Sequence, residues 1–442
     1  MTQRKERADK SLIRNYFPKV SYAFFLLMII SFRGFSQGNT YYISNAGSNN
    51  NSGLSSQQAW RTVSKIRPGN TYLFHSGDVF YTKLYADQTM PTDQKTTISS
   101  YGAGDKPVIS MLKKIQNSHW ARSQNNIYKI SLLDSTSYSG FKEKNTNVGF
   151  IKVNGTMYGN RVQGVDSLSS QWDFFSDKEF LYVYSQSDLS ASNQTIEVAC
   201  SYIGLNLFNN LEVSNIKITG TAGHAIRGVN VNGVTLKGID INEIGGSILQ
   251  GTGNGKVRYG NGIELWNGSQ NCIIEDCNVS QVYDVAFTLQ GNGEGIFKNV
   301  QFDHNKASYN EQSFEFWAKG YNLGFENCSF TNNYCSYAGF GWSHSVRANK
   351  NVGVHILNYI WEVNATGVLI KGNTFYKASS GIYYFTPNKN VSGRYFKSED
   401  NKIYLKPSVP LISGKNKYNR VELEKVLKDS GMDVKSKFHE TN

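Results

Sequence analysis

The amino-acid sequence predicts an all-β protein, a right-handed parallel β-helix, on three observations. An alternating apolar pattern recurs from about residue 211, with a unit of about 23 residues interrupted by insertions. Asn, Gly, Ser and Asp fill the gaps, and these residue types suit tight turns. The chain has 41 Gly against 7 Pro and is 13% aromatic, which is typical of a turn-rich β protein.

Each unit reads apolar, any, apolar, two spacers, apolar, any, apolar, which is the period-two alternation of strands. Stacked units bury the apolar side that a single unit leaves exposed, with strands about 4.8 Å apart. A β-sandwich or a propeller fits less well, because propeller blades repeat at about 40 residues. We align the third apolar slot of six units at Ile216, Ile239, Cys277, Val300, Cys328 and Asn373. Second strands are expected at Ile263–Leu265, Phe287–Leu289, Phe314–Phe316 and Ile382–Tyr384.

Residues 1–36 predict a signal peptide. Six Lys and Arg residues precede an apolar stretch from Tyr22 to Phe32, which is too short to span a bilayer. Gly34-Phe35-Ser36 offers a small-any-small cleavage site, and an uncleaved anchor is the alternative. We expect a secreted protein, in the periplasm, at the cell surface or outside the cell, with no stable membrane span after cleavage.

The remaining chain, residues 37–442, is expected to form a single β-helix domain. Residues 41–80 form its N-terminal cap and first coil, with a helix near 59–66 covering the open end of the stack. Residues 105–200 are expected to form irregular early coils that carry loops. The clearest coils lie between 205 and 385. An amphipathic segment, Val421–Leu427, predicts a C-terminal helix over 419–432, with Gly431 as its stop.

The opening of this domain resembles a known superfamily. The quoted residues are Tyr41-Tyr42-Ile43-Ser44, Gly47-Ser48, Ala59-Trp60-Arg61-Thr62, Pro68-Gly69 and Gly77-Asp78-Val79-Phe80. This segment is similar to the cap and first coil of secreted parallel β-helix proteins of the pectate-lyase-like superfamily, which includes polysaccharide lyases and glycoside hydrolases. The resemblance implies the fold and a polysaccharide substrate. The chain lacks the aspartate cluster of pectate lyases and the aspartate trio of polygalacturonase-like hydrolases, so no catalytic residue is carried over.

The net charge limits the classes of partner, and the cysteine positions indicate a structural role for these residues. The chain has a formal net charge of +12, and about +7 remains without residues 1–36, which favours acidic polysaccharides or reflects a solvated surface. We expect no nucleic-acid partner, because no basic-aromatic module is present in the sequence, and we expect a monomer. Five cysteines include Cys277 and Cys328 at inward slots, which suits buried apolar filler. No cofactor is required by the sequence, and a calcium ion is left open.

Three insertions nominate a site, because loops on a rigid scaffold commonly carry function. They span residues 251–260, 303–311 and 342–361. Between them, strand alternation turns Glu264, Thr288 and Glu315 outward in one column. Trp266, Gln290 and Trp317 form a second column, which suits stacking on sugar rings. Carboxyl groups two strands apart lie about 9.6 Å from each other by backbone spacing, near the about 6.5–9.5 Å of inverting glycosidases. Solvent-exposed decoration is the alternative.

β-Elimination from a uronate needs other groups: a cation for the carboxylate, a base and an acid. Lys256 and Arg258 are candidates for the cation, with a solvated loop tip as the alternative. The candidate proton shuttles are Tyr259, Tyr283, His304 and His344, with Asp284 beside them and His224 a weaker choice. Glu311, His344 and Arg347 join the tryptophan column as candidate substrate-binding residues. Turn capping is the competing role for His304, His344 and Asp284.

The sequence therefore predicts a carbohydrate-active enzyme that cleaves glycosidic bonds of an acidic polysaccharide by β-elimination. Inverting hydrolysis by Glu264 and Glu315 is the close alternative. A non-catalytic glycan-binding β-helix and a C5 epimerase also stay open, because the fold does not decide among them.

Overall fold

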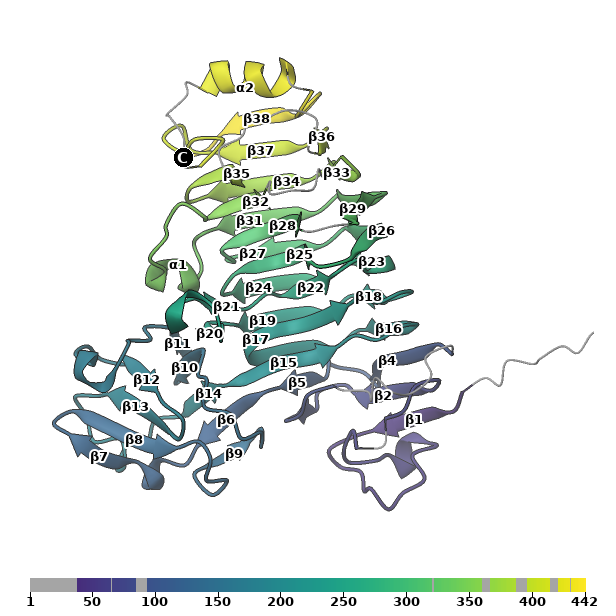
Figure 1. Ribbon diagram of the computed structural model, residues 1–442. Coiled ribbons are helices and arrows are strands. Elements are labelled where there is room, and N and C mark those ends of the chain that lie inside the picture. The colour runs from purple at the N-terminus through teal and green to yellow at the C-terminus, as the bar shows by residue number, and fades with distance from the viewer. Residues whose placement is uncertain are drawn as a thin grey trace, which may run out of the picture. The chain divides into compact units, whose positions relative to one another are not determined.

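The computed structural model describes residues 38–64, 66–84, 94–319, 322–359, 366–386, 396–413, 420–429 and 431–442. Gly38–Asn442 is one compact unit, all-β, with two large sheets of 11 and 16 strands in which every pairing of named strands is parallel (Figure 1). The predicted signal peptide lies outside the described residues. No helix in the described ranges has the length and apolar character needed to cross a membrane.

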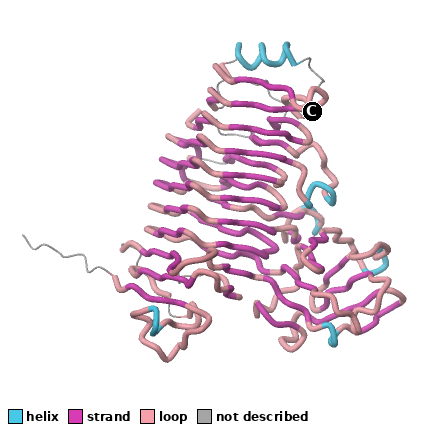
Figure 2. Tube along the Cα trace, turned by 180° about the vertical axis from the view of Figure 1, so that it is seen from behind, coloured by secondary structure: helices cyan, strands magenta, loops and turns pink. Residues whose placement is uncertain are grey.

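The 11-stranded sheet is one row of strands, to which the chain returns once in each repeat. Its members are β1 (Thr40–Ile43), β2 (Thr71–His75), β4 (Thr96–Tyr101), β16 (Leu211–Ser214), β18 (Thr235–Lys237), β23 (Gln270–Glu275), β26 (Gly295–Asp303), β29 (Leu323–Glu326), β30 (Cys328–Thr331), β33 (Val368–Lys371) and β36 (Lys397–Glu399). Seen from behind, the strands stack in parallel with loops at their ends (Figure 2).

The 16-stranded sheet consists of two rows joined by the long strand β17 (Lys217–Val229). The first half of β17 pairs with β19, and its second half pairs with β22. One row holds β3 (Val79–Phe80), β5 (Val108–Ser110), β19 (Asp240–Ile244), β24 (Asn278–Val282), β27 (Lys306–Ser308), β31 (Tyr334–Ala338), β34 (Thr374–Ala378), β37 (Lys402–Leu405) and β38 (Lys437–Glu440). The other holds β15 (Ser201–Asn206), β22 (Ile263–Trp266), β25 (Val285–Asn292), β28 (Gln312–Lys319), β32 (Val354–Tyr359) and β35 (Gly381–Thr386).

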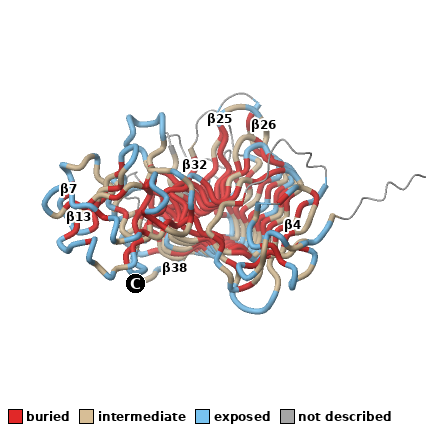
Figure 3. Tube along the Cα trace, turned by 90° about the horizontal axis from the view of Figure 1, so that it is seen from below, coloured by how far each residue is buried: buried red, intermediate tan, exposed pale blue. Residues whose placement is uncertain are grey.

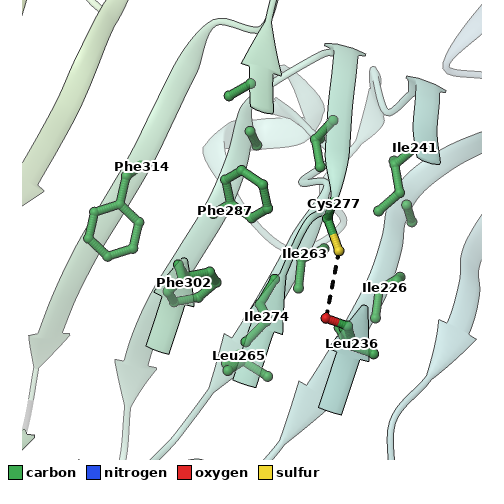
Figure 4. Close-up of a cluster of buried hydrophobic side chains, with 14 of the residues drawn as sticks. Ile226, Leu236, Ile241, Ile263, Leu265, Ile274, Cys277, Phe287, Phe302 and Phe314 are labelled. Atoms are coloured by element: carbon green, nitrogen blue, oxygen red, sulfur yellow. Dashed lines mark hydrogen bonds between the residues drawn. The ribbon is translucent and has the colours of Figure 1, made fainter. Parts of the chain in front are cut away.

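The core lies between these rows, where alternate side chains of each strand point inward and stack in columns. One column comprises Val213, Leu236, Ile274, Phe302, Phe330 and Ile370. Figure 4 shows part of this core, with Ile263, Phe287 and Phe314 from the row that includes β22. Viewed along the stack, buried residues gather in the middle (Figure 3).

The register corrects the predicted alignment of the repeats. Val300 and Cys328 stack on Cys272, in the first slot rather than the third. The third slot is Asn305 and Asn333, each 28 residues beyond its predecessor. The alignment slipped because Phe297 and Phe325, in β26 and β29, continue the same apolar alternation before the repeat proper begins.

Two of the predicted insertions are also shorter than expected. In residues 303–311 the chain forms strand β27, which pairs with β24 and β31. In residues 342–361 it forms helix α1 (Trp342–Val346) and then β32, which pairs with β28 and β35. Both segments complete repeats of the stack, because their alternating residues face the core.

Residues 112–199 correct the expectation of irregular early coils. They form two antiparallel sheets with a separate apolar core. One sheet holds β6 (Leu112–Ile115), β9 (Tyr138–Gly140), β10 (Phe150–Val153), β11 (Thr156–Tyr158) and β14 (Ile196–Ala199); the other holds β7 (Ala121–Gln124), β8 (Ile127–Ser131), β12 (Phe174–Ser176) and β13 (Phe180–Tyr184). We call this part the antiparallel module.

Helices are few in the described residues. The helix expected near 59–66 is absent from its described positions: a 3-10 turn, η1 (Ser56–Gln58), precedes it, and Trp60 instead forms a β-bridge with Ile43. Helix α2 (Arg420–Asp429) lies within the predicted 419–432, between β37 and β38 in the chain, and is drawn at the end of the stack beside β38 (Figure 1). The other 3-10 turns are η2 (Asn117–His119), η3 (Val165–Ser167) and η4 (Gly253–Gly255).

Candidate functional site

A cavity of about 700 Å³ lies over the row β17, β22, β25, β28 and β32. Its floor is formed by side chains of these strands, and two loops form its walls. One wall is the hairpin of β20 (Ser247–Ile248) and β21 (Arg258–Tyr259), and the other is the segment around residues 347–352. This volume matches a site for a small ligand or a short stretch of polymer.

The strand register brings together the two columns predicted from the sequence. Glu264, Thr288 and Glu315 pair in one column, and Trp266, Gln290 and Trp317 pair in the other. Both glutamates line the cavity, yet their residues are only 2% and 7% exposed. They are therefore buried site carboxyls and not surface decoration.

Glu264 is surrounded by donors. The guanidinium of Arg227, its neighbour in the preceding strand, forms an ion pair with Oε1 at 2.8 Å. The side chain of Asn261 donates to Oε2 at 2.6 Å. A carboxylate with these partners is oriented rigidly and remains inside the cavity.

Glu315 has a different environment. Burial, together with the negative charge of Asp284, raises the pKa of Glu315 well above its usual value. Gln290 Nε2 donates to Oε2 at 2.9 Å and Trp317 Nε1 donates to Oε1 at 3.1 Å, and these bonds hold the carboxyl in place. A buried carboxyl of this kind is suited to carry a proton at neutral pH.

Asp284 supplies a third carboxyl group, one residue before the strand that lies between those of the two glutamates. It immediately precedes β25, and Arg347 Nη2 donates to its Oδ1 at 3.1 Å. Burial raises the pKa of Asp284 despite this arginine, and the charge of Glu311 acts in the same direction. Three carboxyl groups therefore share one cavity.

His224 and its aromatic neighbours form the end of the cavity near β17, and sequence reasoning undervalued this histidine. Burial lowers the pKa of His224, so the ring is neutral near pH 7. Its Nδ1 accepts the backbone N–H of Asn261 at 3.2 Å, which places the ring proton on Nε2. The ring centroid lies 5.1 Å from Tyr259 and 6.1 Å from Tyr202. Tyr202 was not predicted, because β15 precedes the repeats that could be aligned.

Aromatic rings line the opposite side of the cavity. Trp266 and Trp317 meet edge to face, with centroids 5.5 Å apart. Trp317 meets Tyr359 in the same way at 6.5 Å. Tyr359 was missed because β32 had been assigned to an insertion. These rings give the cavity an apolar wall beside its acidic floor, a combination that suits sugar rings.

The residues predicted for elimination are not assembled in this way. Lys256 is exposed at the hairpin tip and does not line the cavity, and His304 Nδ1 contacts Asp303 Oδ2 at 2.5 Å in the turn between β26 and β27. Arg258 lines the cavity but donates to three backbone carbonyls, of Gly149, Gly159 and Gly246. It therefore ties the hairpin to the antiparallel module.

The remaining predicted residues support the site from behind. Tyr283 is buried beneath the arginines, with its ring centroid 4.5 Å from the Arg347 guanidinium. Glu311 is fully buried and contacts His344 Nδ1 at 3.0 Å and Arg347 Nε at 3.9 Å. Neither Glu311 nor His344 lines the cavity, whereas Arg347 does. In the described parts of the chain, no group of three His, Cys, Asp or Glu side chains is arranged to hold a metal ion.

Comparison with known proteins gives distant structural matches only. No protein-family model matches the sequence, and no curated protein matches it significantly. A lacto-N-biosidase from Eubacterium ramulus is 12% identical, with a TM-score of 0.44 over 91% of this chain and 68% of that one. An alginate lyase from Paenibacillus sp. is 11% identical, with a TM-score of 0.39 over 91% and 99%. A rhamnogalacturonan lyase is 12% identical, with a TM-score of 0.41 over 91% and 88%.

Proposed function

We propose that this chain is a secreted carbohydrate-active enzyme of the right-handed parallel β-helix fold that hydrolyses glycosidic bonds with inversion. The observation that carries the proposal is the pair Glu264 and Glu315, two strands apart in one column of a cavity. Secretion rests on the sequence of residues 1–36. The parallel rows and their columns of stacked side chains support the fold.

The two glutamates suit different halves of the reaction. Glu315, with its raised pKa, donates a proton to the glycosidic oxygen as the bond to the anomeric carbon breaks. Glu264 accepts a proton from the water that attacks the same carbon from the opposite face. Arg227 and Asn261 orient the Glu264 carboxylate for this role. The products are a shortened glycan and a new reducing end of inverted configuration.

Hydrolysis is favoured over β-elimination because the arginines of the cavity are already bonded within the protein. Elimination needs a cation for the uronate carboxylate, but Arg258 is bonded to backbone carbonyls, Lys256 is outside the cavity and Lys319 lies exposed at the end of β28. Arg227 and Arg347 already pair with Glu264 and Asp284. A general acid and a base, by contrast, are both present.

Substitution of the glutamates tests the proposal. We expect Glu315→Gln and Glu264→Gln each to lower kcat about a hundred- to ten-thousandfold, the usual contribution of a general acid or base. Reducing ends and ultraviolet absorbance of unsaturated uronate are measured together on a panel of polysaccharides. The matched control is Glu326→Gln, an exposed glutamate of β29, which should leave kcat unchanged. Absorbance that rises with reducing ends indicates elimination, and full activity in both glutamine variants rules out this hydrolytic pair.

A further inference from the structure

The cavity contains three arginines, and each is already bonded within the protein. Arg227 forms an ion pair with Glu264 at 2.8 Å, and Arg227 Nη1 donates to the Tyr202 hydroxyl at 3.1 Å. Arg347 donates to Asp284 at 3.1 Å and to a backbone carbonyl at 2.7 Å. Arg258 donates to three backbone carbonyls. These partners occupy part of the donor set of each guanidinium, so fewer N–H groups remain for an anionic substrate.

The carboxyl groups of the cavity make a further negative charge costly. Glu264, Asp284 and Glu315 line it, and the fully buried Glu311 lies behind Arg347. Asp284 and Glu315 both have raised pKa values, with burial as the main cause and neighbouring carboxylates contributing. The burial that disfavours the charged form of these two carboxyl groups would disfavour the charge of a bound uronate in the same way.

Apart from the exposed Lys319, the remaining polar groups of the cavity are neutral. His224 is neutral with its proton on Nε2, and burial raises the pKa of Tyr259 to about 12, so its phenol is protonated. Gln290, Asn292 and Asn349 add amides, which both donate and accept hydrogen bonds. Sugar hydroxyl groups do the same, whereas a carboxylate only accepts.

We infer that the sugar units bound in this cavity are uncharged, so that the substrate is a neutral glycan or a neutral stretch of a mixed one. That the ligand is a sugar rests on the proposed function. The inferred substrate differs from the acidic polysaccharide expected from the net charge, because the cavity lining holds four Lys and Arg side chains against three carboxyl groups and most of the surplus therefore lies elsewhere. Lys319, exposed at the end of β28, is the cation through which an acidic substrate could still be recognised.

Matched pairs of ligands test the inference. Oligogalacturonates and hyaluronan oligosaccharides are compared with their carboxyl-reduced forms, which keep the linkages and lose the charge. Neutral xylan, mannan, glucan and galactan oligosaccharides complete the set. Binding to the wild type and to Glu315→Gln is followed by calorimetry at low and high salt. We expect a neutral or carboxyl-reduced ligand to bind at least about tenfold more tightly than its acidic counterpart, with affinity independent of salt.

Each other outcome overturns the inference. The inference is wrong if an acidic oligosaccharide binds as tightly as its carboxyl-reduced form. Loss of that binding in Lys319→Gln would identify the cation responsible. Failure of every neutral ligand to bind also overturns it. Turnover separates the two proposals: binding of a neutral glycan without cleavage refutes hydrolysis alone, and hydrolysis of an acidic glycan without a rise in ultraviolet absorbance refutes neutrality alone.

Discussion

At the scale of single residues, the site depends on carboxyl groups that differ in environment more than in type. Glu264 lies among donors and Glu315 lies against aromatic rings and another carboxylate. Strand alternation predicted that both point the same way, because register and period follow from sequence. Their burial and the partner Asn261 could not be predicted, because they depend on loops whose paths the sequence does not specify. Arg227 lies in the second half of β17, whose pairing with β22 the apolar pattern did not reveal.

The charge of Asp284 should be visible in the pH dependence of catalysis. If Glu315 is the acid, activity is present while it is protonated and is lost as pH rises through its pKa. Asp284 contributes, after burial, to raising that pKa, so Asp284→Asn should shift the basic limb of the kcat profile to lower pH. The control is Asp276→Asn, an exposed aspartate whose loss should not move the limb. If the basic limb of Asp284→Asn lies at the same pH as in the wild type, or at a higher pH, the proposed coupling between Asp284 and Glu315 is wrong.

At the scale of elements, asparagines replace apolar residues at one slot of the later repeats. Asn305, Asn333, Asn373 and Asn401 stack in a buried ladder. Each side-chain oxygen accepts the backbone N–H of its predecessor, at 2.8–2.9 Å. The ladder therefore satisfies backbone groups at a corner where no strand pairing is available. The predicted alignment placed Asn373 at this slot but missed Asn305 and Asn333, since a polar residue at an inward slot breaks the apolar pattern on which the alignment relied.

Removal of one member should weaken the whole stack. Asn333→Ala leaves the Asn305 N–H and the Phe302 carbonyl without the partners they have now. We expect the free energy of unfolding to fall by about 2–5 kcal/mol, the cost of two unsatisfied buried groups. Denaturant titration measures the loss. Gln301→Ala, an exposed position of β26, should change stability by less than about 0.5 kcal/mol, and equal effects from the two variants would contradict the role of the ladder.

At the scale of the whole molecule, the sequence predicted the stacked parallel strands but not the antiparallel module. The repeats can be recognised because their spacing and apolar alternation recur along the chain. Residues 112–199 contain strands whose pattern does not recur. The module matters for the site, because its Gly149 and Gly159 carbonyls hold Arg258 in the cavity wall. Because no second copy of this pattern exists in the sequence, the pairing of these strands could not be predicted by aligning repeats.

No covalent cross-link holds the described stack together. All five cysteines are free and buried, and burial raises each thiol pKa to about 12. We expect the Tm to be the same with and without reductant. Ellman's reagent should react with no thiol of the native protein and with all five after unfolding. Rapid labelling of a native thiol, or a Tm that falls in reductant, would contradict this arrangement.

The column of Glu264, Thr288 and Glu315 has a consequence for stereochemistry. Side chains of one column are separated by whole strand spacings, so the distance between two acids changes in steps of about 4.8 Å rather than continuously. Two steps approach the separation of inverting enzymes, and one step approaches the about 5–5.5 Å of retaining enzymes. Thr288 occupies the intermediate step. In this scaffold, the anomeric outcome of a reaction is therefore decided by which repeat carries the acid.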